Sequence, residues 1–73
     1  MMSDEILIFK TSVRTEKDIE RIGILFAQNS CIHKWNVDFE DWEKVLRIES
    51  HGLTASCVIE LLFTIELIAS ELE

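Results

Sequence analysis

Cys31 and His33 are the two residues whose types and spacing best suit metal chemistry. They stand two positions apart in a segment of alternating apolar residues, so on a strand their side chains project to the same side. A soft metal ion accepts sulfur and nitrogen ligands, but two ligands leave a site incomplete, and His51 or Cys57 would have to converge on it. The alternative is that Cys31 packs in the sheet, because free cysteines are among the most buried residue types.

Ser12, Arg14 and Thr15 form a second candidate site, for a small anionic ligand. They precede a predicted helix, whose first N–H groups and positive dipole end attract an anion. The Arg14 guanidinium would add charge-assisted hydrogen bonds. The alternative roles are structural, with Thr15 capping the helix and Arg14 in solvent.

Four carboxylates surround a predicted hairpin turn, at Asp38, Glu40, Asp41 and Glu43. Oxygen ligands suit a hard cation, but the calcium-loop spacing with its central glycine is absent, so a solvated acidic turn is favoured. The sequence also has no nucleophile beside a base at a recognisable spacing, no glycine-rich phosphate loop and no tyrosine. We therefore predict neither catalysis nor a cofactor.

The composition excludes several classes of function. The chain has 73 residues, with 7 Lys and Arg against 14 Asp and Glu, a net charge of −7 and no cationic cluster, which argues against nucleic-acid binding. The most apolar stretch, residues 58–70, contains Glu60 and Glu66 and is too short to cross a membrane. Two cysteines do not make a disulfide framework, and the acidic N-terminus lacks the features of a secretory signal. We expect a single cytoplasmic domain over residues 1–73.

Apolar periodicity predicts the elements that position these residues. Residues 5–11 are typical of a buried strand. Thr15 is expected to cap a helix that runs to about Gln28, within which Gly23 indicates a close approach to the sheet. The next strand, residues 31–39, has two predicted faces, one with Cys31, His33, Trp35, Val37 and Phe39 and the other with Ile32, Lys34, Asn36 and Asp38.

The second half of the chain begins with a hairpin, because a short polar connection leads into a strand over residues 44–50. Leu46 and Ile48 lie on one face of that strand. Thr54 is expected to cap a second helix. Residues 66–73 leave two alternatives open: the same apolar stripe extends the helix, or a last strand forms over residues 67–72.

The β-α-β-β-α-β order, the stretch Trp35-Asn36-Val37-Asp38-Phe39-Glu40-Asp41 and the following Lys44-Val45-Leu46-Arg47-Ile48-Glu49 resemble the heavy-metal-associated (HMA) domains, in particular a small stand-alone bacterial branch without metal-binding cysteines. The resemblance implies an α+β fold, a ferredoxin-like two-layer sandwich with an antiparallel four-stranded sheet. The closing Ala69-Ser70-Glu71-Leu72-Glu73 resembles the family's final strand and favours the strand alternative. The family usually has a glycine before that strand, where Glu66 stands here.

The resemblance also identifies the loop where HMA domains hold copper, through a Met-x-Cys-x-x-Cys motif. Here the loop is Thr11-Ser12-Val13-Arg14-Thr15, which contains no cysteine, methionine or histidine. Hydroxyls and a guanidinium do not replace the thiolates that a soft ion needs. The resemblance therefore implies the fold with a degenerate metal site and no cofactor.

Exposed apolar residues give the leading functional hypothesis. Ile6 and Ile8 alternate with Leu7 and Phe9, so both faces of the first strand are apolar, whereas helices cover one face of such a sheet. Trp42 lies in the hairpin turn between acidic residues. We expect a protein-interaction or regulatory module that forms homo-oligomers, although core packing would explain the same residues. The alternative function is a copper or zinc carrier or sensor that uses Cys31 and His33.

Overall fold

A computed structural model describes residues 5–40 and 42–72 of the chain. Asp41 of the acidic turn and Glu73 of the expected last strand lie outside the described residues. The elements are β1 (Glu5–Thr11), α1 (Glu16–Ala27), β2 (Ile32–Asp38), β3 (Val45–Ser50), α2 (Ala55–Phe63) and β4 (Ala69–Glu71). The strands form a four-stranded antiparallel sheet in the order β2-β3-β1-β4. This is the predicted ferredoxin-like arrangement.

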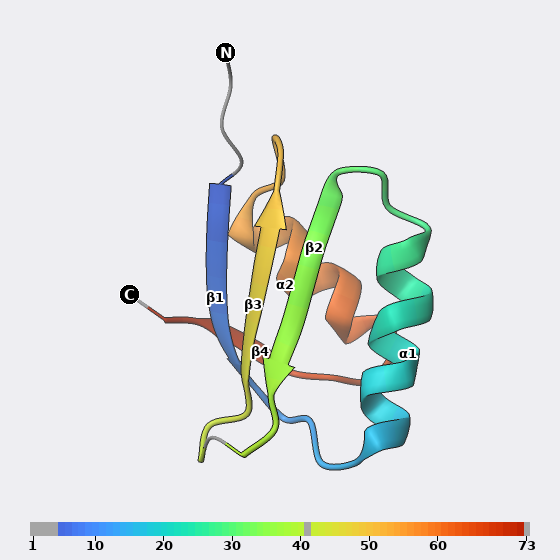
Figure 1. The fold of residues 1–73 in the computed structure, drawn as a ribbon, viewed down its shortest axis with the longest axis vertical. Coiled ribbons are helices and arrows are strands. Elements are labelled where there is room, and N and C mark those ends of the chain that lie inside the picture. The colour runs from blue at the N-terminus through green and yellow to red at the C-terminus, as the bar shows by residue number, and fades with distance from the viewer. Residues whose placement is uncertain (1–4, 41, 73) are drawn as a thin grey trace.

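Alternation along the central strands separates a covered face from an open face. Phe9 of β1 and its neighbours Leu46 and Ile48 of β3 are fully buried. Ile6 and Ile8 of β1 point to the other face and remain exposed. In Figure 1 the strands β1, β3 and β2 lie in front of α2, so the open face is the one toward the viewer. Neither described helix has the length and apolar composition needed to cross a bilayer.

Both helices begin at the predicted threonines. Thr15 and Thr54 have extended backbones, and their hydroxyls accept hydrogen bonds from the N–H groups of Asp18 and Cys57. These caps satisfy donors that would otherwise have no partner in the first helical turn. Each helix then presents an apolar side to the sheet, through Ile22 and Phe26 in α1 and Val58 and Leu62 in α2.

Gly23 of α1 faces Trp35 of β2, but the contact is not tight. A Cβ at Gly23 would lie 3.5 Å from Trp35 Cζ2, which is ordinary van der Waals contact. Trp35 packs edge-on against Phe26, with 5.5 Å between the ring centroids. The expected close approach at Gly23 is therefore not one that requires a glycine.

A β-bulge interrupts β2 and changes which of its residues share a face. Ile32 pairs with Ser50 and Lys34 pairs with Glu49, so His33 is an extra residue between two consecutive pairs. Because the bulge shifts the alternation, Ile32 packs against the core. The prediction that Ile32 shares a face with Lys34 is wrong. Beyond the bulge, Trp35 and Val37 face the core as predicted.

A left-handed residue ends α2 and allows the last strand to form. Glu66 has φ 65°. Its N–H donates to Phe63 O, and the N–H of Leu67 donates to Leu62 O, which is the hydrogen-bond pattern of a Schellman cap. The chain then turns back and pairs β4 with the end of β1. The structure thus favours the strand alternative, and Glu66 occupies a position that suits glycine.

Ser50 is a buried polar residue at the end of β3. Its side chain is fully buried, and within the described part of the chain its Oγ has no hydrogen-bond partner. A buried hydroxyl without a partner costs about 1–3 kcal/mol. We expect Ser50→Ala to raise the free energy of unfolding by about 1 kcal/mol in urea denaturation. Ser70→Ala, at an exposed position of β4, is the matched control and should change little. Destabilisation by Ser50→Ala would show that the hydroxyl is satisfied.

Candidate functional site

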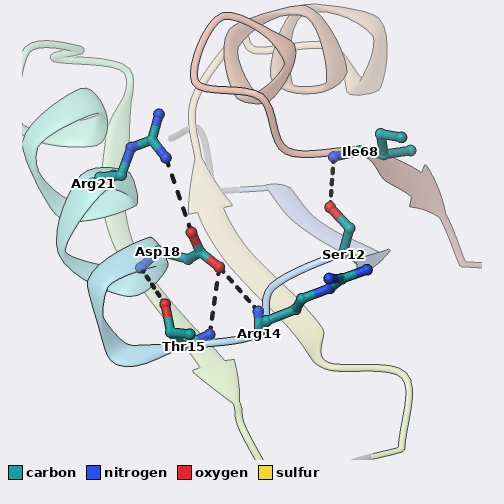
Figure 2. A network of polar contacts seen from close by, with 6 residues as sticks. All are labelled: Ser12, Arg14, Thr15, Asp18, Arg21 and Ile68. Carbon is teal, nitrogen blue, oxygen red and sulfur yellow. Dashed lines mark hydrogen bonds and ion pairs between the residues drawn. The ribbon is translucent and has the colours of Figure 1, made fainter.

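The loop between β1 and α1 is tied to the segment before β4. The N–H of Ser12 donates to Ile68 O, and Ser12 Oγ accepts a hydrogen bond from the N–H of Ile68, both at 2.9 Å. Figure 2 shows the second of these bonds joining the two segments. Ser12 therefore has a structural role that the sequence did not indicate, because its partner lies 56 positions along the chain.

Asp18 holds the N–H groups that an anion would use at the start of α1. Its Oδ2 accepts hydrogen bonds from the N–H groups of Arg14 and Thr15, at 3.0 and 3.3 Å. Arg21 Nη1 lies 4.0 Å from the other carboxylate oxygen. Figure 2 shows this carboxylate between the loop and Arg21. The chain thus places its own anion at the dipole end where an external one is expected.

These contacts hold the pKa of Asp18 below its ordinary value. The hydrogen bond from the Arg14 N–H is the largest influence, and partial burial acts against it. The Thr15 N–H, the positive charge of Arg21 and the Thr15 hydroxyl lower the pKa further. A carboxyl whose pKa is lower in the folded state stabilises the fold above its unfolded pKa, and this contribution is lost as the pH falls through the folded value.

We expect Asp18→Ala to lower the free energy of unfolding by about 1 kcal/mol at pH 7, which is typical for loss of a helix cap. The difference from the native chain should shrink as the pH falls below about 4, because the Asp18 carboxyl then binds a proton first in the unfolded chain and, at lower pH, in the folded chain. Urea denaturation at pH 7 and at pH 3 measures both values. Glu20→Ala, at an exposed position of the same helix, is the control. A difference that does not depend on pH would contradict the ionic role.

Arg14 is the remaining member of the predicted anion site. The structure brings Ser12, Arg14 and Thr15 together in one loop, and the Arg14 side chain extends away from Asp18 (Figure 2). Among the described residues, its guanidinium has no ion pair. The backbone donors of this loop are already in use, so the guanidinium is the group that remains for a ligand.

The predicted metal ligands are distributed over several elements. Cys31 is half-buried and packs against the core, and its N–H donates a hydrogen bond to Asn29 Oδ1. His33, in contrast, is exposed at the bulge. The bulge breaks the regular alternation on which their shared side was predicted. Cys57 is exposed on α2 beside a hollow of about 370 Å³ that Leu53 and Leu61 also line. Over residues 5–40 and 42–72, no group of three or more His, Cys, Asp or Glu side chains is placed to hold a metal ion.

The hairpin turn between β2 and β3 is anchored to β1. Thr11 Oγ1 donates to Lys44 O at 2.7 Å, and the Thr11 N–H donates to Glu43 O. Lys44 Nζ lies 5.2 Å from the centre of the Phe39 ring, a cation–π contact. Beyond these anchors, Trp42 is 93% exposed. In Figure 1 the turn extends past the lower end of the sheet.

The open face of the sheet combines an aliphatic strip with charged side chains. Ile6 and Ile8 of β1 are 47% and 36% exposed on this face, beside β3. In the register of the described strands, Ile8 is opposite Arg47 and Arg47 is opposite Asn36. Two depressions of about 240 and 400 Å³ adjoin this row, and Asn36 and Arg47 line both.

Sequence reasoning missed three further exposed apolar residues. Ile24 of α1, Phe63 of α2 and Ile68 before β4 are each exposed by more than 60%. Periodicity could not identify Ile68, because it belongs to the apolar stripe of an extended helix that does not form. Ile24 and Phe63 fall outside the buried stripes of their helices, and that offset was the available signal.

Comparison of the chain with family models, with curated proteins and with solved structures finds no match.

Proposed function

We propose that this chain is a non-catalytic, HMA-like domain without the usual metal ligands, which acts as a protein-interaction or regulatory module and self-associates through the open face of its sheet. The observation that carries the proposal is the exposure of Ile6 and Ile8 on β1. Both residues pair with β3, opposite Glu49 and Arg47, and the register of β1 with β4 covers residues 9–11, so the two side chains lie beside β3 on the open face. A second molecule that covered them would remove apolar surface from water.

The likeness to HMA domains is part of this proposal. It is supported by the element order, by the sheet order and by a loop between β1 and α1 at the position of the family's metal motif. The left-handed Glu66 adds support, because it takes the backbone conformation that the family's glycine before the last strand would adopt easily. The thiolate ligands of that family have no counterpart among residues 11–15.

Both edges of the sheet have features that disfavour pairing with another strand. At one edge, β2 has a bulge next to Lys34. At the other edge, β4 has three residues and ends in Glu71. Bulges, short edge strands and edge charges are the usual means by which proteins prevent strand addition. These features favour association through the open face over addition of a strand to β2 or β4.

We expect Ile8→Lys to abolish self-association while the fold is retained, because a lysine ammonium on each copy would have to be desolvated in the contact. Sedimentation over a wide range of protein concentration measures the mass, and circular dichroism checks the fold. Ile24→Lys makes the same change on an exposed position of α1 and is the control. If the native chain is monomeric at every concentration, or if Ile24→Lys dissociates it as fully as Ile8→Lys, the proposal fails.

A further inference from the structure

The turn that carries Trp42 is held to β1 by hydrogen bonds. Thr11 donates hydrogen bonds to the carbonyl groups of Glu43 and Lys44, directly after Trp42, and the Lys44 side chain lies over the Phe39 ring before it. Despite this support, the indole is 93% exposed and packs against no core residue. Large aromatic side chains of this kind contribute much of the binding energy in protein interfaces once they enter a pocket. Trp42 is thus a preformed projection without a pocket on its own chain.

The smaller depression on the open face has a volume and a lining that suit an indole. Its volume is about 240 Å³, and its lining residues are Ile8, Asn36, Asp38, Val45 and Arg47. Ile8 and Val45 supply apolar walls for a flat ring. Arg47 supplies a guanidinium, which stacks favourably on the face of a tryptophan.

The charges of the two parts are complementary. Glu40 and Glu43 flank Trp42 in the turn, and both are exposed. The open face has the reverse balance: in the described strands its cations are Lys10, Lys34 and Arg47, and its carboxylates are Asp38 and Glu49. In a chain with a net charge of −7, this face is where an acidic projection meets an excess of positive charge.

We propose that Trp42 of one copy of this chain inserts into the depression between Ile8, Val45 and Arg47 on the open face of a second copy. The inference rests on the proposed function and deepens it, because it names the side chains that make the contact. Each copy carries both Trp42 and this smaller depression, so reciprocal insertion closes a two-fold dimer. A second copy is the partner that fits, since the chain itself supplies both halves of the contact with complementary charge.

Fluorescence of Trp42 tests the contact directly. In a Trp35→Phe background Trp42 is the single tryptophan, and its emission should move to shorter wavelength as the protein concentration rises through the dimer dissociation constant measured by sedimentation. Trp42→Ala should raise that constant by about 30-fold or more. Phe63→Ala removes another largely exposed aromatic ring, on α2, and should leave the constant unchanged.

A charge exchange tests the pairing of the turn with the open face. Arg47→Glu and Glu40→Lys should each weaken the homodimer by about tenfold. An equimolar mixture of the two variants should recover native affinity, because the reversed charges meet in the mixed dimer. Lys17→Glu, an exposed charge reversal on α1, is the control and should change little.

The outcomes separate this inference from the proposed function. A dimer whose Trp42 emission does not depend on concentration, and which persists in Trp42→Ala, overturns the inference and leaves self-association standing. A dimer that Trp42→Ala dissociates, but whose charge variants do not recover on mixing, also overturns the pairing with Arg47. A chain that stays monomeric at all concentrations overturns both proposals.

Discussion

Replacing Phe9 with alanine is expected to unfold a large fraction of the protein at 25 °C. Phe9 is fully buried on β1, and it pairs with Leu46 on one side and Glu71 on the other. Truncation of a buried phenylalanine costs about 3–5 kcal/mol, whereas a domain of 73 residues has a total stability of roughly 4–11 kcal/mol. Urea denaturation followed by circular dichroism measures the change.

Ile8→Ala is the matched control, one position away on the opposite face. At a protein concentration low enough to keep the chain monomeric, it should cost about 1 kcal/mol or less, because Ile8 is already partly exposed. At higher concentration the proposed self-association would stabilise the native chain, so the cost of Ile8→Ala should grow. Equal costs for Phe9→Ala and Ile8→Ala in the monomer would contradict the assignment of one covered face and one open face.

The double variant Gly23→Ala, Glu66→Gly is expected to be more stable than the native chain by about 1.5 kcal/mol. At position 23, alanine raises helix propensity by about 1 kcal/mol, and its methyl has room beside Trp35. At position 66, glycine removes the strain that a side chain causes in the left-handed conformation. Glycine also loses more backbone entropy on folding, so the net gain in the free energy of unfolding is about 0.5 kcal/mol. The effects should add, because within 4 Å the new Cβ meets Trp35 alone.

Thermal unfolding measures this gain, which corresponds to a rise in Tm of about 6–12 °C for a domain of this size. Gly52→Ala is the control with the opposite sign. Gly52 has φ 74° and open space around it, so an added Cβ is strained by the backbone and not by any neighbour. If Gly52→Ala stabilises the chain or Glu66→Gly destabilises it, the left-handed assignment at that position is wrong.

Most of the fold was predictable because its signals are local. Alternation placed Leu46 and Ile48 on one face of β3, and the hydroxyls of Thr15 and Thr54 marked both helix starts. The ferredoxin-like fold with an antiparallel four-stranded sheet followed from the order of elements and the resemblance to HMA domains, and the structure agrees with it. The strand faces and helix caps depend on residues within a few positions of one another along the chain. The fold class depends on the order of strands and helices, which the periodicity of apolar residues indicates.

What the sequence could not decide depends on contacts between distant segments. The bulge at His33 arises in the pairing of β2 with β3, and nothing in the local pattern marks it. β4 has three residues, too few for a period, and it forms through its pairing with β1. The end of α2 at Glu66 was ambiguous because its left-handed turn uses a glutamate where glycine is the usual signal.

The candidate site was predictable in its residue types more than in its connections. Ser12, Arg14 and Thr15 do lie together, but the sequence did not reveal that Asp18 receives the backbone donors or that Ser12 joins Ile68. Likewise, both faces of β1 were recognisably apolar, while the depression beside Arg47 needed three strands in register to define it.

Isoleucine methyl resonances, followed by NMR during dilution, test most directly whether the open sheet face is where this protein self-associates. The four probes Ile6, Ile8, Ile24 and Ile68 are all partly or largely exposed and sample both sides of the molecule. We predict that the Ile6 and Ile8 signals shift with concentration along one binding curve while the Ile24 signal stays constant. Constant Ile6 and Ile8 signals, or shifts confined to Ile24 and Ile68, would contradict the account.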